Sequence, residues 1–332
     1  MNPLIPVHAL QGALPLPDWG VIRAAGDDAR SFLHGQLTQD TLHLEAGSAR
    51  LAGYCSVKGR LLASFVVWRR APEEVFLACS ADLLPATLKR LSMFVLRAKC
   101  KLTDASGDVA LWGLAGDAAT VWLGANAPTA VWGRVDMGEA VVIRLPDAGT
   151  GTGTSTSTGT GTSTSTDTTS VARYLWAAPA AEPAPALPAL DADAWRWLEV
   201  HSGVARITAA TSEHFVPQMV NLELVGGVNF QKGCFPGQEI VARSQYRGTL
   251  KRRAFVVEAG TALAPGQEVF HSADPEQPAG MVALAGSVAG HHSALVELKI
   301  AATETGALTA GTASGPLLRL GALPYAFPAE TP

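Results

Sequence analysis

A single cysteine stands between two glycines in the stretch Lys232-Gly233-Cys234-Phe235-Pro236-Gly237-Gln238-Glu239. Upstream, Gly226 to Phe230 is typical of a short strand bounded by glycines. Downstream, residues 240 to 244 place their apolar side chains on one side of a helix that Pro236 can begin. Cys234 would then lie near a helix N-terminus, where the helix dipole and the Lys232 ammonium stabilise a thiolate. The stretch predicts a nucleophile, a redox thiol or a metal ligand, and its alternative is a small residue that fills a tight turn.

A family resemblance extends well beyond this stretch. It runs nearly without interruption through Pro217 to Leu222, Gly226 to Glu239 and Ala242 to Gly248. Over these residues the chain resembles the YgfZ family of folate-binding proteins, which are relatives of the glycine-cleavage T-protein. The resemblance implies a protein that supports the assembly or repair of certain iron–sulfur enzymes and that affects tRNA methylthiolation indirectly.

Two regions nearer the start of the chain carry the same resemblance independently. Gly26 to Asp40 resembles the first helix of the family and the turn beyond it, with Asp27 or Asp28 as a suitable N-cap. Cys55 to Leu62 resembles a strand-turn-strand of the family, with Lys58-Gly59 as the turn and a buried strand from Leu61 to Trp68.

Composition is that of a soluble globular protein. The 332 residues are 48% hydrophobic and 16% charged, so the chain can bury more than one core and its length favours two or three domains. The net charge of -4 gives no indication of nucleic-acid binding. A local basic run suits a phosphate, a polyglutamate tail or another anion, although a solvated face is the alternative. This run comprises Arg243, Arg247, Lys251, Arg252 and Arg253.

Cysteine usage and apolar patterning favour a reducing cytoplasm. The four cysteines are widely spaced and form no C-x-x-C pair, which argues against a disulfide framework or a conventional zinc site. His34 and His214 are isolated, with no second ligand at a telling spacing. Met1 to Gly20 lacks the features of a signal peptide, and no apolar run reaches the roughly 20 residues that span a bilayer. We therefore expect no membrane partner and no direct nucleic-acid partner.

Segment patterns predict an α+β fold in four parts. These are an N-terminal α+β region (15–147), a flexible insertion rich in Thr, Gly and Ser and then in Ala and Pro (148–190), a second α+β part with the cysteine stretch (191–250), and a C-terminal β-barrel domain (251–328). Periodicity predicts helices at 83–95 and 191–201, and strands at 75–79, 109–114, 141–145, 254–257, 268–271, 281–285 and 295–300. The resemblance implies a T-protein-like plan, with two intertwined α+β domains around a central folate-binding hole plus the C-terminal β-barrel.

The resemblance also implies the functional residues. It places the chemistry at Cys234 and Lys232 and implies a bound tetrahydrofolate or a derivative. The residues implied to hold the folate are Asn221, Gln238, Glu239, Arg243, Arg247 and His201. For Gln238 and Glu239 the alternative is hydrogen bonding to backbone N–H groups at the start of a helix.

The chain departs from its relatives at two positions. T-proteins carry a carboxylate just after the Lys-Gly turn, where this chain has Ala63 and Ser64. His201 is expected to take the place of a glutamate that grips the pterin ring in folate-binding relatives. Neutral imidazole offers one acceptor and one donor, whereas a carboxylate accepts two N–H groups at once. The alternative for His201 is a partly buried helix residue with a satisfied hydrogen bond.

The leading hypothesis is a cytoplasmic YgfZ-like protein that uses a reduced folate, Cys234 and Lys232 to sustain iron–sulfur enzymes, with those enzymes or their assembly factors as partners. The thiolate would accept a sulfur or alkyl group, ligate iron transiently or undergo redox exchange. One alternative is a folate-dependent aminomethyl or one-carbon transferase, which the missing carboxylate disfavours. Another is a non-catalytic interaction module whose basic run binds a partner protein. Whether the protein is an enzyme stays open.

Overall fold

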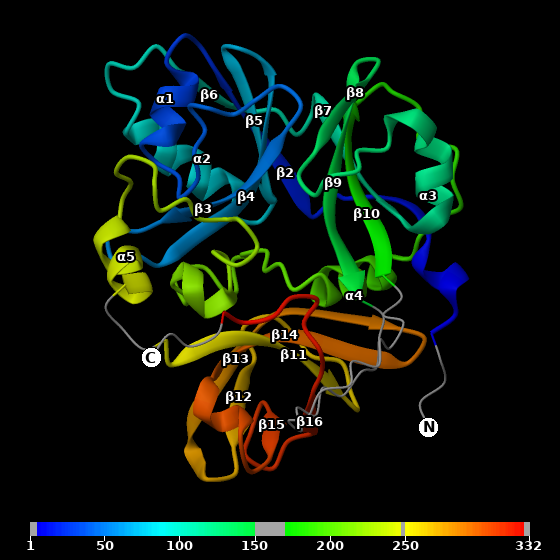
Figure 1. The fold of residues 1–332 in the computed structure, drawn as a ribbon, viewed down its shortest axis with the longest axis vertical. Helices are drawn as coiled ribbons and strands as arrows, with labels where there is room; N and C mark the ends of the chain where they lie inside the picture. The colour runs from blue at the N-terminus through cyan, green and yellow to red at the C-terminus, as the bar shows by residue number, and fades with distance from the viewer. Residues whose placement is uncertain (1–4, 150–169, 247–249, 329–332) are drawn as a thin grey trace.

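Residues 5–149, 170–246 and 250–328 of the chain are described from a computed structural model. Nearly all of the Thr/Gly/Ser repeat, and also Arg247, lie outside the described residues. The described residues form two five-stranded antiparallel sheets side by side and a closed barrel beneath them (Figure 1). The predicted α+β class with a C-terminal barrel is confirmed.

The first sheet has the strand order β3-β4-β5-β2-β6. Its strands are β2 (Trp19–Ala25), β3 (Ala49–Cys55), β4 (Leu61–Ala71), β5 (Glu74–Ser80) and β6 (Lys101–Asp104), and its helices are α1 (Ala29–His34) and α2 (Leu84–Met93). The predicted turn at Gly59 joins β3 to β4, with a positive φ of 69° that glycine adopts without strain. Asp28 stands at the N-cap of α1, but its carboxylate accepts the backbone N–H of Lys99 at 2.7 Å instead of capping the helix.

The second sheet has the order β1-β7-β10-β9-β8. Its elements are η1 (Val7–Leu10), β1 (Gly12–Pro15), β7 (Val109–Ala115), α3 (Gly116–Leu123), η2 (Gly124–Asn126), β8 (Arg134–Met137), β9 (Ala140–Gly149) and β10 (Ser170–Pro179). β1 precedes the whole first sheet in the chain yet pairs with β7, with Gly12 opposite Ala115. The two sheets are therefore intertwined along the chain.

The prediction of a flexible insertion over 148–190 is wrong for residues 170–179. These residues form β10, the middle strand of the second sheet, between β7 and β9. Tyr174, Leu175 and Trp176 are buried there, so the strand contributes apolar surface to the core. The composition of the preceding repeat and of the following Ala/Pro residues concealed this strand.

The C-terminal barrel closes in the order β11-β14-β13-β12-β15-β16. Its elements are β11 (Arg252–Ala259), β12 (Glu268–His271), β13 (Asp274–Val288), β14 (His291–Lys299), η4 (Ile300–Thr303), β15 (Leu308–Ala310) and β16 (Leu317–Leu320). The strand predicted at 268–271 coincides with β12. β13 extends well beyond the predicted 281–285, because it pairs with β12 near its start and with β14 over its later part.

The centre of the molecule is built by α4 (Ala192–His201), which lies between the second sheet and the barrel (Figure 1). Asp191 caps this helix by accepting the backbone N–H groups of Asp193 and Ala194 at 2.7 and 3.3 Å. A Cβ on Gly286 of β13 would lie 2.3 Å from the backbone nitrogen of Trp197, so the absence of a side chain lets the helix backbone approach the barrel. After the barrel the chain returns to this centre, where the Tyr325 hydroxyl donates to the carbonyl of Gly203 at 2.7 Å.

Candidate functional site

Residues 38–39, which follow α1, lie against residues 226–229, which precede Cys234. The Thr38 hydroxyl donates to the Gly227 carbonyl at 2.6 Å, and the Gln39 amide donates to the Gly226 carbonyl at 2.6 Å. The backbone N–H of Asn229 donates to the Thr38 carbonyl at 2.9 Å. These bonds hold residues 226–229 as an irregular segment, so the predicted strand over 226–230 does not form.

The loop that carries the cysteine is shaped by Asn229. Its side-chain oxygen accepts the backbone N–H groups of Gln231 and Lys232, at 2.8 and 3.1 Å. The Lys232 side chain turns inward: the residue is only 8% exposed, its ammonium donates to the Gly233 carbonyl at 3.1 Å, and it lies 4.9 Å from the centre of the Phe235 ring. Cys234, two residues further on, is exposed. A buried cation therefore sits beside a thiol that solvent reaches.

Gly237 immediately precedes the helix that follows the cysteine loop, and its backbone conformation fixes where that helix begins. Its φ is 77°, and a Cβ there would lie 2.3 Å from the carbonyl oxygen of Ser56, in the turn between β3 and β4. This close contact places the start of α5 (Gln238–Tyr246) beside the turn between β3 and β4, and α5 begins only after the glycine. The short helix η3 (Pro217–Val220) packs against α5 and β11. The prediction that Pro236 begins the helix is wrong, and Cys234 stands four residues before α5.

A histidine and an aspartate that sequence reasoning did not pair lie next to the cysteine loop. Nδ1 of His34, the last residue of α1, is 3.0 Å from Oδ1 of Asp40. The other ring nitrogen, Nε2, faces Gly233, since a Cβ built there would lie 3.5 Å from it. The same Asp40 carboxylate accepts the backbone N–H of His43 at 3.1 Å and contacts its ring at 2.8 Å. The signal in the sequence was the position of both residues inside the segment 26–40 that carries the family resemblance.

The charges of this cluster are coupled. Burial lowers the pKa of Lys232 to about 8, against the opposing charges of Asp40 and Cys234. Burial and the Lys232 charge lower the pKa of His34, although Asp40 opposes them. Burial would raise the pKa of Asp40, but hydrogen bonds from His43 and the charges of both histidines outweigh it and lower the pKa to about 2. At neutral pH the cluster therefore combines an ionised carboxylate, a neutral imidazole and a lysine that is mostly charged.

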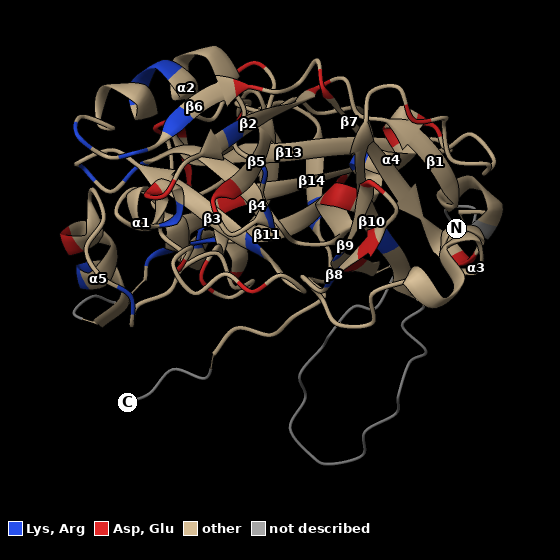
Figure 2. Ribbon diagram, turned by 90° about the horizontal axis from the view of Figure 1, so that it is seen from above, with Lys and Arg blue, Asp and Glu red and all other residues tan. Residues whose placement is uncertain are grey.

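The residues of α5 that the resemblance implies for folate binding do not face the central cavity. Arg243 donates to the carboxylate of Glu239 at 2.7 Å, and both side chains are more than half exposed on α5. Acidic and basic residues lie side by side on this helix (Figure 2). Gln238, at the start of α5, is half-buried. None of the three lines the central cavity, a hollow of about 40 Å³ between the two sheets and α4.

Asn221 is fully buried and holds the centre of the fold together. Its backbone is left-handed, with a φ of 57°, and its amide donates to the Ala254 carbonyl at 2.8 Å and to the Tyr325 hydroxyl at 3.2 Å. This asparagine therefore links η3 with the barrel and with the segment that follows the barrel.

The predicted basic run is not a free cationic surface where it is described. Nη1 of Arg252 donates to both carboxylate oxygens of Glu297, at 2.8 and 2.9 Å. Buried Arg253 pairs with Glu223, whose side chain is 4% exposed. Three arginines of the run, Arg243, Arg252 and Arg253, pair with carboxylates of the chain. An anion site built from the run stays a prediction. Lys251 remains exposed.

A small cavity lies between the two sheets and α4. Its volume is about 40 Å³, enough for a few water molecules. Glu199 of α4 lines it and contacts Arg206, with Oε1 3.4 Å from Nε. Trp19 Nε1 and Arg173 Nε, which belong to two further lining residues, have no hydrogen-bond partner among the described residues. The cavity is thus lined by a carboxylate and by two residues whose buried N–H groups have no partner among the described residues.

His201 faces away from this cavity. Its ring stacks on Trp197 at 3.8 Å between centres, and Nε2 lies 3.1 Å from the Ser293 hydroxyl of the barrel. Burial lowers the pKa of His201 to about 4. The alternative interpretation of His201, as a partly buried helix residue with a satisfied hydrogen bond, describes its surroundings. The acidic residue of α4 at the cavity is Glu199, two positions earlier, which the sequence interpretation missed.

The sequence comparisons identify the family. No protein-family profile matches the chain. The "tRNA-modifying protein YgfZ" of Edwardsiella ictaluri is 32% identical over 273 residues, which cover 79% of this chain and 76% of that protein. The chain belongs to the YgfZ family. The protein of the same name from Photobacterium profundum is 30% identical over 250 residues, covering 75% of this chain and 70% of that relative.

A solved structure shares the fold of this YgfZ-family protein. The glycine cleavage system aminomethyltransferase T from Bartonella henselae superposes with a TM-score of 0.70 over 96% of this chain and 87% of that one, at 15% sequence identity. The T-protein-like fold expected from the resemblance is confirmed.

The other cysteines of this YgfZ-family chain are sheltered. Burial raises the pKa of Cys55 and Cys79 to about 12 and that of Cys100 to about 11. Within the described ranges no group of three or more His, Cys, Asp or Glu side chains is arranged to hold a metal ion. Over the same ranges, no helix has the length and apolar character needed to cross a membrane. Cys234 is therefore the thiol of this chain that an external reagent reaches most easily.

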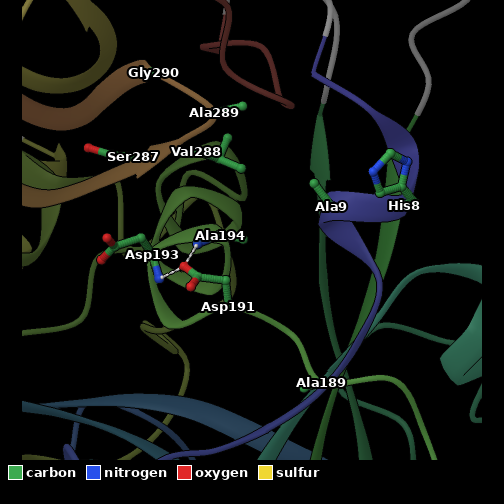
Figure 3. Close-up of a pocket in the computed structure, with 10 residues that line it drawn as sticks. All are labelled: His8, Ala9, Ala189, Asp191, Asp193, Ala194, Ser287, Val288, Ala289 and Gly290. Atoms are coloured by element: carbon green, nitrogen blue, oxygen red, sulfur yellow. Dashed lines mark hydrogen bonds between the residues drawn. The ribbon is translucent and has the colours of Figure 1, made fainter.

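A second hollow lies apart from the cysteine loop. Figure 3 shows it at the N-terminus of α4, between η1 and the β13–β14 turn, with a volume of about 430 Å³. Asp191, whose carboxylate caps the helix, and Asp193 are its acidic residues. Among the predicted site residues that the structure describes, none lines it.

Proposed function

We propose that this YgfZ-family protein binds tetrahydrofolate or a derivative and supports the assembly or repair of iron–sulfur enzymes in the cytoplasm, acting through Cys234 and Lys232. An effect on tRNA methylthiolation would be indirect, through an iron–sulfur enzyme and without contact to RNA. The observation that carries the proposal is the exposed Cys234 beside the inward-turned ammonium of Lys232. The relatives' shared name, "tRNA-modifying protein YgfZ", supports the link to tRNA.

The central cavity supports the folate part of the proposal by its chemistry. Glu199 can accept N–H groups of a pterin ring, and the unused N–H groups of Trp19 and Arg173 can donate to ring oxygen or nitrogen atoms. The cavity of about 40 Å³ is too small for a pterin, so binding requires the lining side chains to move apart. When bound, a reduced folate would supply a one-carbon unit or a ring that can be oxidised.

The alternative of an aminomethyl or one-carbon transferase gains no support from the cavity. Ala63 is fully buried, and the hydroxyl of Ser64 accepts the backbone N–H of Ile207 at 2.9 Å. Glu199 supplies the carboxylate among the described lining residues, and it is held by Arg206. The alternative of an interaction module that binds through residues 251–253 is weakened by the ion pairs of Arg252 and Arg253.

The proposed function is tested by complementation of a bacterial strain that lacks its own YgfZ. We expect the native chain to restore the activity of an iron–sulfur dehydratase and the level of methylthiolated tRNA under oxidative stress, and Cys234→Ala to restore neither. Cys100→Ala is the matched control, because it removes a thiol that is half-buried and lies outside the loop. Equal rescue by native chain and Cys234→Ala would contradict a role for this thiol, and failure of the native chain to rescue would contradict the function itself.

A further inference from the structure

We propose that His34 accepts the proton of Cys234 and that Asp40 fixes the orientation of His34, so that the three residues form a nucleophile, a base and an orienting carboxylate. This inference rests on the proposed function, in which Cys234 is the reactive group, and it assigns the group that generates the thiolate. Cys234 and the other two residues come from distant parts of the sequence, and the packing of residues 38–39 against residues 226–229 brings them together.

The first step of the argument is the tautomer of His34. Asp40 is ionised at neutral pH and can only accept hydrogen bonds, so the Nδ1 atom that lies 3.0 Å from its Oδ1 must carry the proton. A neutral imidazole with its proton on Nδ1 has its free lone pair on Nε2. This is the arrangement in which a carboxylate prepares a histidine to act as a base.

The second step is the direction of that lone pair. Nε2 lies 3.5 Å from the position of a Cβ on Gly233, the residue that immediately precedes Cys234. The Cα of Cys234 follows one peptide unit later, about 3.8 Å along the chain. Cys234 is exposed, and in the proposed arrangement rotation about its Cα–Cβ bond places Sγ next to Nε2. Catalytic hydrogen bonds commonly tighten in this way only in the reacting complex.

The third step concerns the charged groups around His34. Those that influence it are Asp40, His43 and Lys232. Burial and the Lys232 charge keep the imidazole neutral and therefore able to accept a proton. Lys232 does not serve as the base at neutral pH, because with a pKa of about 8 most of its amine already carries a proton. Lys232 instead acts as the cation that favours the thiolate.

The proposed step balances as a proton transfer. The Cys234 S–H bond breaks, its proton moves to Nε2 of His34, and the sulfur keeps the electron pair. The products are a thiolate beside Lys232 and an imidazolium beside Asp40, so each new charge has an opposite partner. The exposed thiolate can then attack an electrophilic carbon or sulfur atom that approaches from solvent.

The test is the rate of Cys234 alkylation by iodoacetamide between pH 5.5 and pH 9, read by mass spectrometry of the peptide that contains Cys234. We expect His34→Gln to lower the rate at pH 7 by about tenfold or more and to remove the part of the pH profile that depends on the imidazole. Asp40→Asn should lower it as well, because the amide no longer selects the tautomer. Thermal unfolding of each variant, read by circular dichroism, checks that the fold is intact.

His43→Gln is the matched variant, since it removes a ring contact with the same Asp40 carboxylate but leaves His34 in place. We expect a much smaller change from it than from His34→Gln. Equal rates for native chain and folded His34→Gln, or equal losses for the two histidine variants, would overturn the proposal. The failures of the two proposals can be distinguished. If the alkylation rate of Cys234 depends on His34 but Cys234→Ala fully rescues the strain, this inference stands and the proposed function is refuted.

Discussion

Glu199 and His201 stand two residues apart on α4 and face different surroundings. Successive helical residues are rotated by about 100°, so a displacement of two positions carries a side chain to nearly the opposite side of the helix. Glu199 meets Arg206 and the central cavity, whereas His201 meets Trp197 and the barrel. The sequence interpretation chose the residue that faces the barrel, because the resemblance located the helix but not the face of each residue.

This assignment predicts the effect of single residues on folate binding. We expect Glu199→Gln to weaken the binding of tetrahydrofolate by about tenfold or more, since a hydrogen bond to a charged group contributes about 1.5–3 kcal/mol. Glu239→Gln, on exposed α5, should leave binding unchanged. Isothermal titration calorimetry of both variants with tetrahydrofolate tests this prediction. A loss of affinity confined to Glu239→Gln would instead favour the folate site on α5 that the resemblance implies. Arg206 retains Asp18 as a partner at 2.8 Å in the Glu199 variant, which protects its fold.

At the scale of elements, periodicity located several segments that are apolar on one face. The helix predicted at 83–95 corresponds to α2 and the strand at 75–79 to β5. Besides β10, which its flanking composition concealed, a failure occurred where side-chain hydrogen bonds determine the backbone path. Residues 226–230 have strand-like composition, yet Thr38 and Gln39 bind their carbonyls and prevent a ladder. The pairing of His34 with Asp40 was hidden for a similar reason, because it depends on the turn that follows α1.

The docking of α5 predicts the outcome of a substitution in the cysteine stretch. We expect Gly237→Ala to loosen α5 and the cysteine loop, because Ala is strained at a φ of 77° and its Cβ would meet the Ser56 carbonyl at 2.3 Å. Gly226→Ala is the control, with a similar φ of 80° but no atom within 4 Å of the added Cβ. Hydrogen exchange of residues 238–246 should accelerate in the first variant and not in the second. The same exchange in both would mean that the contact with Ser56 does not position the helix.

At the scale of the whole molecule, His201 couples the stability of the α4–barrel contact to pH. Burial lowers its folded-state pKa from 6.5 to about 4, so between these values the unfolded chain binds a proton that the folded chain does not. The contribution of His201 to the free energy of unfolding is therefore fully present above pH 6.5 and is lost as the pH falls towards 4. The loss between pH 7.5 and pH 5 should be about 2 kcal/mol, at about 1.4 kcal/mol per pKa unit.

The measurement is urea unfolding at several pH values for the native chain and for His201→Phe, which preserves an aromatic ring against Trp197. We expect the variant to show a smaller loss of stability on acidification by about that amount. Removal of the Ser293 hydrogen bond shifts the stability of the variant at every pH and leaves the slope comparison intact. Parallel curves for the two proteins would show that His201 does not account for the acid sensitivity.

The return of the chain to the centre after the barrel has a consequence for the order in which the protein forms during synthesis. Tyr325 binds the Gly203 carbonyl, 122 residues earlier in the chain, and shares its hydroxyl with Asn221. While a ribosome is still translating the barrel, the Gly203 carbonyl and the Asn221 amide lack the Tyr325 hydroxyl as a partner. The two sheets can fold beforehand, but the contacts around Asn221 are completed only when the residues beyond the barrel leave the ribosome. A nascent chain stalled before Tyr325 should therefore be cleaved by proteases at this junction.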